Sequence, residues 1–369
     1  MIPGEMVPEG TRPHFASEAW VRRELRERLF QLFTLWGYAP VELPALERYD
    51  PLHPLAARTF NLIDRNGEIL SLRAEFTTAL ARLIAPGLEG TPLRLQYAGE
   101  LWLREADAEL GRLREFSQVG LELIGVSSPQ VDAELLELAW EALQALGFEE
   151  ARLEVGLPAL VGDLLSATGL AEAERERLRR ALHRKNIPEL EEQLKAYGVR
   201  GSLAEALLRL PDLYGEREVL REARQLSLSP KAQADLDWLA EVLEALPHLP
   251  LLLDLGRARR LDFYTGINFQ AYTPDFGLPL LGGGRYDGTL LPKAAGLSVG
   301  LDRALEALGF PEREQPPEVL ALDRELARAL RREGRRVELA WTADREALRA
   351  YALKRGIRWL ALEGRLEEL

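Results

Sequence analysis

The sequence predicts an α+β fold in which helices flank an antiparallel sheet, with a helical insertion and a small C-terminal α/β unit. Residues 93–104 and 116–124 alternate polar and apolar side chains, which is typical of long strands with two different faces. Residues from about 157 to 249 instead repeat leucine at helical spacing, which predicts the insertion. A chain of 369 residues has room for about two or three domains.

Composition and charge exclude several classes of protein. The chain is 47% apolar and 29% charged, as expected for a soluble globular protein. It has no cysteine, so disulfides, thiolate catalysis and cysteine-ligated metals are excluded. Its apolar runs are shorter than the about 20 residues that span a bilayer, and its N-terminus lacks the features of a signal peptide. We therefore expect a cytoplasmic protein without a membrane partner, and its net charge of −12 disfavours nucleic-acid binding.

The first predicted element is a helix over residues 17–36. Apolar side chains recur there at helical spacing, Ser17 is a suitable N-cap and Gly37 is a natural stop. The apolar face is broad and aromatic, so it could cover a sheet, a partner helix or both. Because monomers rarely expose such a patch, we expect a homodimer at minimum.

Strands are expected next. A short strand at 41–43 ends at Pro44, and a hairpin at 60–72 turns at the Asn-Gly pair of residues 66 and 67. The two long alternating strands are expected to pack their apolar side chains on the core and to present their charged side chains to a ligand or to water.

The elements after the insertion are predicted from the same signals. Strand patterns return, glycines cluster at 282–284, and residues 296–300 are expected to open a helix that ends near Leu308. Residues 311–317 resemble a linker. The strands expected in this part lie at 251–255, 262–272, 336–340 and 358–362. The expected helices lie at 323–332 and 345–354.

Three polar constellations are candidates for a binding site. In an extended 116–122 segment (FSQVGLE), Gln118 and Glu122 share a face, and Gly120 between them leaves room for a small ligand with an ammonium or imidazole N–H. The alternative is a solvated sheet face. In 72–77 (LRAEFT), Glu75 and Thr77 form a second acceptor pair if the segment is extended; the alternative is a helix N-terminus capped by Thr77.

Arginines 257, 259 and 260 precede residues 261–264 (LDFY) and could hold a carboxylate or a phosphate, although a surface salt-bridge cluster is the alternative. Residues 282–288 (GGGRYDG) lack the spacing of a phosphate-binding loop or a dinucleotide fingerprint, so they indicate close backbone approach at a turn or against a ligand. The four histidines are scattered without ligand spacing, and we expect neither a metal nor a cofactor.

Taken together and in order, these segments resemble the histidyl-tRNA synthetase family, whose catalytic domain has the class II synthetase fold. Residues 72–77 are similar to its LRPE(x)T motif, with Ala74 in place of proline. Residues 259–264 (RRLDFY) are similar to the family's RGLDYY, with Arg260 in place of glycine. The other similar segments are 103–104 with 111–116 (motif 2), 283–287 (GGRYD) and 296–303 (motif 3). The resemblance implies a synthetase-like domain over 1–310, with the insertion at about 157–249, and a truncated anticodon-binding-like unit over 318–369.

The departures from the family pattern indicate a subfamily. Ala106 stands where motif 2 normally carries an adenine-contacting acid, and Asp107 reverses the charge of its next basic position. Residues 318–369 are shorter than the family's anticodon-binding domain and, with 12 basic and 10 acidic side chains counted in the sequence, are not expected to bind tRNA. This combination resembles the synthetase paralogue that serves as the regulatory subunit of ATP phosphoribosyltransferase.

The resemblance implies a non-catalytic chain that senses histidine for feedback and activates a short catalytic subunit, as part of a hetero-octamer. The alternative is an active histidyl-tRNA synthetase or a tRNA-independent adenylating ligase. No catalytic residue is expected in this chain. Arg104 and Arg303 match phosphate-binding arginines of the family and would be vestiges of an ATP site. The histidine-binding residues implied by the resemblance are Glu75, Thr77, Gln118, Glu122, Arg259, Tyr264 and Tyr286.

Overall fold

The structure is a computed structural model whose described residues form two compact units. The larger unit lies within residues 1–13 and 21–310, and the smaller one within 14–20 and 311–369. The two units are described separately. The structure describes residues 7–87, 92–104, 113–226, 228–257, 264–309 and 316–369.

The larger unit is built on a mixed sheet that is antiparallel through its centre. Among the described residues the strand order is β1-β5-β6-β12-β11-β10-β7-β9-β8, in which β1–β5 and β7–β9 are the parallel pairs. This arrangement confirms the predicted antiparallel sheet. The strands are β1 (Ala39–Pro40), β5 (Leu93–Trp102), β6 (Glu115–Ile124), β7 (Arg152–Gly156), β8 (Tyr214–Gly215), β9 (Leu251–Asp254), β10 (Asn268–Thr273), β11 (Phe276–Arg285) and β12 (Ala294–Gly300).

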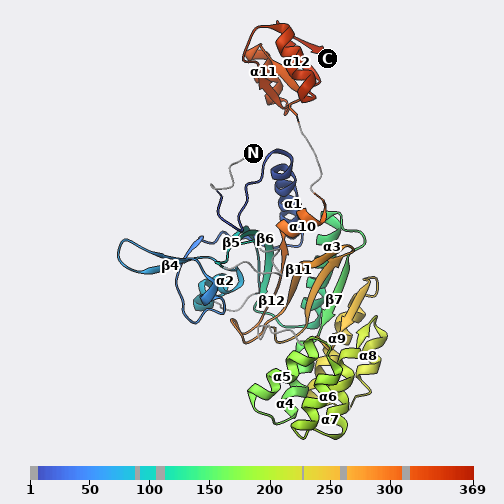
Figure 1. Cartoon of the computed structure of the whole chain (residues 1–369). Coiled ribbons are helices and arrows are strands. Elements are labelled where there is room, and N and C mark those ends of the chain that lie inside the picture. Colours follow the sequence, from blue (N-terminus) through green and yellow to red (C-terminus); the bar gives the residue numbers. More distant parts are fainter. Residues whose placement is uncertain (1–6, 88–91, 105–112, 227, 258–263, 310–315) are drawn as a thin grey trace. The chain divides into compact units, whose positions relative to one another are not determined.

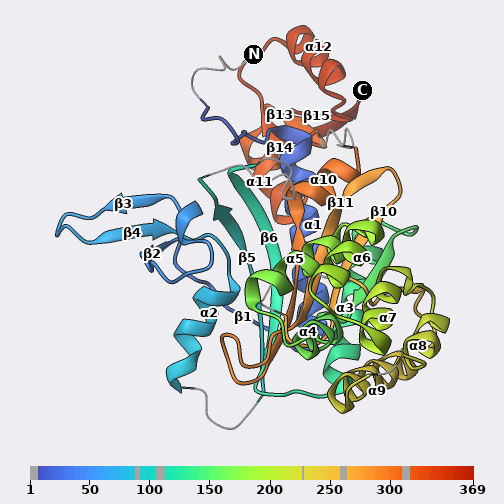
Figure 2. The same ribbon diagram turned by 60° about the horizontal axis from the view of Figure 1, so that its bottom comes forward.

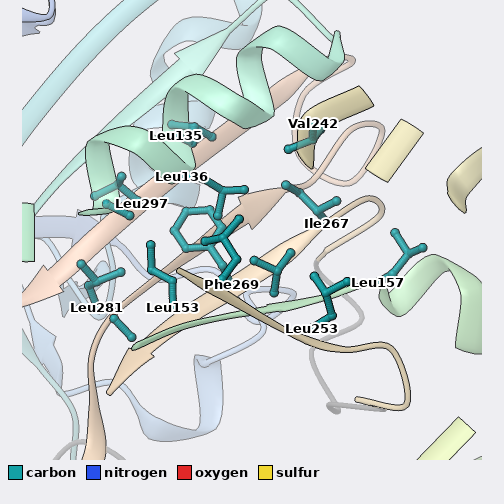
Figure 3. Packing of buried hydrophobic residues seen from close by; sticks show 14 of the residues in the cluster. Leu135, Leu136, Leu153, Leu157, Val242, Leu253, Ile267, Phe269, Leu281 and Leu297 are labelled. Carbon is teal, nitrogen blue, oxygen red and sulfur yellow. The ribbon is translucent and has the colours of Figure 1, made fainter. Parts of the chain in front are cut away.

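The main core lies between one face of this sheet and helix α3 (Pro129–Leu146). The helix begins where the Ser128 side chain accepts a hydrogen bond from the backbone N–H of Val131, and it ends at Gly147 with φ 92°. Figure 3 shows Leu135 and Leu136 of this helix facing side chains from the strands. The labelled strand residues of this cluster are Leu153, Leu253, Phe269, Leu281 and Leu297.

Helix α1 (Ala16–Leu35) covers the same core with Leu25, Leu29 and Phe33, which are buried as the helical spacing predicts. The helix begins one residue before Ser17, so the prediction that Ser17 is its N-cap was wrong. None of the helices in the described part of the chain combines the length and apolarity that a membrane span requires.

The helical insertion is confirmed, and the short strand β8 within it pairs with β9. Its helices appear green to yellow in Figures 1 and 2. They are α4 (Pro158–Ala167), α5 (Glu172–His183), α6 (Ile187–Ala196), α7 (Gly201–Arg209), α8 (Glu218–Ala223) and α9 (Pro230–Ala245). The other short helices described in the unit are α2 (Thr77–Ile84), α10 (Leu301–Ala307), η1 (Ala56–Arg58), η2 (Ala85–Gly87) and η4 (Leu210–Asp212).

The predicted hairpin is present as β3 (Asn61–Ile63) and β4 (Ile69–Leu72), with β2 (Leu46–Arg48) on the other side of β4. Both views show it projecting from the larger unit (Figures 1 and 2). Gly67 in its turn has φ 84°, which explains the Asn-Gly signal. The strand expected at 41–43 was wrong, because the paired residues are Ala39–Pro40.

Two predictions around the glycine-rich segments were also wrong, whereas the close backbone approach expected at 282–284 was confirmed. Of the strand expected at 262–272, residues 262 and 263 lie outside the described residues, residues 264–267 are not extended strand, and β10 begins at Asn268. Residues 296–300 do not open a helix but lie in β12, and the helix begins at Leu301. The glycines at 282–284 lie within β11 rather than at a turn. A Cβ on Gly283 would lie 2.4 Å from the Gly296 carbonyl oxygen, so close backbone approach explains these glycines.

The faces of β5 are reversed relative to the prediction. Gln96 is buried on the core side, where its amide donates to the Tyr38 carbonyl at 2.8 Å, and Arg94 pairs there with Glu134 of α3. Tyr97 and Leu101 lie on the opposite face in a separate apolar cluster. Apolar side chains therefore line the face on which a ligand was expected, because α1 and α3 supply polar partners on the other side.

Residues 316–369 of the smaller unit form a four-stranded sheet with two helices, in the order β14-β13-β15-β16. Asp323 and Asp344 cap its two helices. The predicted elements are present, and β16 adds a strand that the sequence pattern did not reveal. The elements are β13 (Val319–Ala321), α11 (Arg324–Arg332), β14 (Val337–Leu339), α12 (Arg345–Arg355), β15 (Trp359–Leu362) and β16 (Arg365–Glu368).

Candidate functional site

A buried carboxyl group is the centre of the candidate site. The Glu122 side chain on β6 is 2% exposed and accepts hydrogen bonds from three hydroxyl groups. Its Oε1 accepts from Thr77 at 2.8 Å and from Tyr97 at 3.3 Å, and its Oε2 accepts from Tyr286 at 2.5 Å. We call Thr77, Tyr97, Glu122 and Tyr286 the Glu122 cluster.

The environment of this cluster changes its protonation. Burial raises the pKa of Glu122 to about 7, although the hydrogen bonds from Tyr286 and Thr77 oppose the shift. The pKa values of Tyr97 and Tyr286 lie well above the ordinary range, because both hydroxyls are buried and because the Glu122 charge is close. Both tyrosines therefore remain donors, while the carboxyl can be charged or neutral near pH 7.

The sheet register explains why these groups meet. Tyr97 on β5 pairs with Gly120 on β6, and Glu122 pairs with Gly296 on β12. A Cβ on Gly296 would lie 2.0 Å from Oε2 of Glu122, so only glycine fits beneath the carboxyl. A Cβ on Gly120 would lie 2.6 Å from the Tyr97 hydroxyl. The expectation that Gly120 leaves room for a ligand was therefore wrong, since Tyr97 fills that space.

Tyr264 lies over the same row of the sheet. Gly296 pairs with Gly284, and the Tyr264 Cδ1 is 2.8 Å from the position that a Gly284 Cβ would take. Tyr264 also contributes to the raised pKa of Tyr286. The glycines on β12 and β11 thus allow two side chains, Glu122 and Tyr264, to lie close to the sheet on the same face.

Glu75 and Thr77 come from the start of α2 rather than from an extended segment. Glu75 accepts hydrogen bonds from the backbone N–H of Thr78 at 2.9 and 3.1 Å, and His53 Nε2 lies 3.2 Å from its Oε1. The helix-start alternative was therefore right, but the capping side chain is Glu75 and not Thr77. The Glu75 charge still reaches the site, because it helps to raise the pKa of Glu122.

Gln118 lies on the same strand face as Glu122 but outside its hydrogen bonds. Its amide donates to the Ser298 hydroxyl at 2.9 Å. Gln118 pairs with Gly300 on β12, and Nε of Arg303 lies 2.8 Å from the position of a Gly300 Cβ. Arg303 therefore stands at the Gln118 end of this face.

The other predicted site arginines are less informative. Arg104 is exposed and donates to the Ala57 carbonyl at 3.0 Å. Arg259 lies outside the described residues, as do Ala106 and Asp107 of the motif 2 segment. Arg257 is 7% exposed and contacts Glu154 at 3.2 Å, so it belongs to a buried polar network rather than to a surface cluster.

The GGRYD segment divides into a site residue and two structural residues. Arg285, 4% exposed, pairs with Asp132 of α3 at 2.7 Å. Asp287 accepts from the backbone N–H of Ala294 at 2.8 Å. These contacts fix the end of β11 and hold Tyr286 between them toward Glu122. No group of three or more potential metal ligands occurs among the residues that the structure describes.

Sequence reasoning missed Tyr97 and His53 as neighbours of the site. Tyr97 could have been found, because a tyrosine on an alternating strand can fill the space in front of an opposing glycine. His53 lies in an irregular segment before η1, and its contact with Glu75 has no periodic signal in the sequence.

Comparisons with known proteins identify the family. The histidyl-tRNA synthetase family model matches residues 10–311. An ATP phosphoribosyltransferase regulatory subunit from Thermus thermophilus is 57% identical over 356 residues, covering 96% of this chain and 97% of the relative. A regulatory subunit of the same name from Deinococcus radiodurans is 45% identical, covering 95% of this chain and 87% of the relative.

Solved structures agree with this result. An ATP phosphoribosyltransferase regulatory subunit/histidyl-tRNA synthetase from Bacillus halodurans has a TM-score of 0.83 and 29% identity, covering 94% of this chain and 96% of that one. Histidyl-tRNA synthetase from Nostoc, with a TM-score of 0.78 and 19% identity over 96% of this chain and 90% of that one, shares the fold. The predicted class II synthetase-like fold and the regulatory role are thereby confirmed. The chain belongs to the histidyl-tRNA synthetase family and, within it, to the ATP phosphoribosyltransferase regulatory subunits.

Proposed function

We propose that this chain senses histidine for an ATP phosphoribosyltransferase complex, in which it activates a short catalytic subunit and transmits feedback inhibition. The observation that carries the proposal is the Glu122 cluster: a buried carboxyl group held by three hydroxyls on the glycine-lined face of the sheet. A buried carboxyl of this kind is a strong acceptor for the N–H of an imidazole ring.

The pKa of about 7 for Glu122 favours histidine as the ligand. An imidazole has an ordinary pKa of about 6.5, so the carboxyl and the ring can share one proton near neutral pH. Tyr264 lies on the same face of the sheet and would meet the second ring nitrogen. The protein would thus recognise the ring through both of its nitrogens. A purely aliphatic amino acid has no ring nitrogens and would not make these contacts.

The amino acid end of histidine would be bound by the surrounding polar groups. Glu75, Thr77 and Gln118 would take the ammonium group. Arg259 would take the carboxylate as a charge-assisted pair, a role that rests on the family resemblance of its segment. Arg104 and Arg303 would remain as vestiges of an ATP site. Because no bond is made in this chain, loss of ATP contacts would not impair its role.

Regulation follows from linkage. If one quaternary state of the complex binds histidine more tightly, histidine shifts the population toward that state by its differential affinity. A coupling free energy of about 1–3 kcal/mol is typical and would suffice for feedback. The proposed complex is a hetero-octamer that contains this chain at least as a homodimer, with no tRNA and no cofactor.

The decisive experiment is co-purification with a short-form catalytic subunit, followed by an activity assay with and without histidine. We expect the chain to raise the phosphoribosyltransferase activity, and millimolar histidine to inhibit the complex. Glu122→Gln should weaken inhibition by roughly 10- to 150-fold, because hydrogen bonds to charged groups contribute about 1.5–3 kcal/mol. Glu150→Gln, at an exposed position, is the matched control and should leave inhibition unchanged.

Two results would contradict the proposal. Undiminished inhibition in the Glu122→Gln complex would mean that histidine acts at another site. Histidine-dependent ATP–pyrophosphate exchange by the chain alone, well above a no-enzyme control, would favour the synthetase or adenylating-ligase alternative.

A further inference from the structure

The smaller unit carries a groove lined by arginines. Four arginines of α11 and Leu339 of β14 enclose an open groove of about 340 Å³. The arginines are Arg324, Arg328, Arg331 and Arg332. Successive arginines are separated by four, three and one residues along the sequence, so their side chains lie on one face of the helix. At 1.5 Å per residue the row extends over about 12 Å. We call this feature the arginine groove.

Most of these guanidinium groups have no partner among the residues that the structure describes. Arg331 donates from Nε and Nη2 to the Val337 carbonyl at 3.1 and 2.7 Å, which holds it at the groove. Arg324, Arg328 and Arg332 make no hydrogen bond or ion pair with any residue in the described ranges. Some other arginines of the unit are paired, for example Arg335 with Glu318 at 3.2 Å.

The folded unit alone does not explain this arrangement. Arg331 and Arg332 lie in the last turn of α11, where positive charges complement the helix dipole. Arg324 is the first residue of the helix, where a positive charge opposes the dipole. The pairs Arg324/Arg328 and Arg328/Arg332 also place like charges four residues apart, which disfavours the helix. Sequences that break local rules in this way commonly do so for a binding function.

The lining of the groove indicates the class of ligand. Planar guanidinium groups bind phosphate oxygens in bidentate fashion. Among the described lining residues Leu339 is the only one with an apolar side chain, so the charged groups that the groove offers are all cationic. The volume lies at the lower end of small-ligand pockets, which span roughly 300–1,000 Å³. We propose that the arginine groove binds an oligophosphate chain, such as the triphosphate of a nucleotide, independently of the Glu122 cluster.

The test is calorimetric titration of the full chain with inorganic tripolyphosphate at low salt. We expect saturable binding that is tighter than for monophosphate and that weakens as salt is added, because ion pairs are screened. The double variant Arg324→Ala/Arg328→Ala should weaken binding at least about tenfold, the loss of about 1.4 kcal/mol. The control Arg349→Ala/Arg365→Ala removes the same charge from exposed positions of the unit and should bind like wild type.

Several outcomes would overturn the proposal. One is the absence of binding heat when the wild-type chain is titrated with about millimolar tripolyphosphate. Another is an equal loss of tripolyphosphate affinity in the control variant, which would mean that binding depends only on net charge. A hexaglutamate peptide that binds as tightly as tripolyphosphate would indicate an acidic protein partner instead. A short single-stranded RNA that binds while tripolyphosphate does not would indicate a nucleic-acid surface. Circular dichroism of both double variants checks that α11 remains helical.

Discussion

The Tyr286 hydroxyl donates a hydrogen bond of 2.5 Å to Oε2 of Glu122, although 164 residues separate them in the chain. Tyr286 follows β11 directly and Glu122 lies within β6, with β12 between the two strands in the sheet. The contact therefore requires the strands to be in register, and Gly296 on β12 leaves the space in which it forms.

Tyr286→Phe removes one donor from the buried carboxyl and keeps the ring. We expect the pKa of Glu122 to rise above its value of about 7, because the hydrogen bond from Tyr286 opposes the effect of burial. Histidine affinity should fall by roughly 10- to 150-fold, since the hydrogen bond from Tyr286 orients the Glu122 carboxyl, which is proposed to accept a hydrogen bond from the histidine ring. Isothermal titration calorimetry of wild type and variant measures the change.

Tyr214→Phe is the matched control for this variant. The Tyr214 hydroxyl also donates to a carboxyl, Glu154 at 3.3 Å, but it lies at the β8–β9 edge of the sheet. Its removal should leave histidine affinity within about twofold of wild type. Equal losses in the two variants would contradict a specific role for Tyr286.

The free energy of unfolding should depend on pH through Glu122. Burial raises its pKa from the ordinary 4.5 to about 7 in the folded chain. Between these values the folded state holds a proton that the unfolded state has lost, so this contribution is complete below pH 4.5 and disappears as pH rises through 7. Its size is on the order of 3 kcal/mol. Glu122→Gln should flatten this part of the stability curve.

Urea unfolding from pH 4.5 to 8 measures the effect. Glu149→Gln, at an exposed position, is the control and should retain the wild-type slope. A Glu122→Gln curve that falls as steeply as the wild-type curve would mean that other groups cause the pH dependence.

The strands and helices could be predicted where one periodic pattern dominates a segment. The insertion and the hairpin at Gly67 are examples, because their signals are local. The segment at 296–300 shows the limit. Its glycines suggested a helix start, but Gly296 serves strand packing, because a Cβ there would meet Glu122 and the Leu121 carbonyl oxygen on the neighbouring strand β6. The reversed faces of β5 have the same cause, since Gln96 is buried by partners on α1 that the strand pattern does not contain.

The candidate site could be predicted in part. Thr77 and Glu122 were identified from the polar patterns of their segments and Tyr286 through the family resemblance, and the hydrogen bonds unite them. Tyr97 was missed because its role depends on which residue of β6 it faces. Glu75 was identified, but its helix-capping contact was not, because the helix-start alternative assigned the cap to Thr77.

The buried pair of Arg285 and Asp132 should contribute strongly to stability. Asp132 is fully buried and also accepts from Trp238 at 2.7 Å, so the pair joins β11, α3 and α9. Asp132→Ala would leave the buried guanidinium without its main partner and should lower the free energy of unfolding by about 3–5 kcal/mol. Chemical denaturation measures this loss. The exposed control Asp212→Ala should stay within about 0.5 kcal/mol of wild type, and a loss below about 1 kcal/mol in Asp132→Ala would contradict the prediction.

Gly296→Ala tests the geometry of the Glu122 cluster with a single methyl group. The new Cβ would lie 2.0 Å from Oε2 of Glu122 and 2.5 Å from the Leu121 carbonyl oxygen. The carboxyl must therefore move away from Tyr286, while the backbone contact adds about 1–3 kcal/mol of strain. We expect histidine binding to be lost in calorimetry and the melting temperature to fall. Gly162→Ala is the control, since nothing lies within 4 Å of its Cβ position in α4, and alanine should stabilise that helix slightly. Wild-type histidine affinity in Gly296→Ala would show that the ligand does not depend on the position of the Glu122 carboxyl.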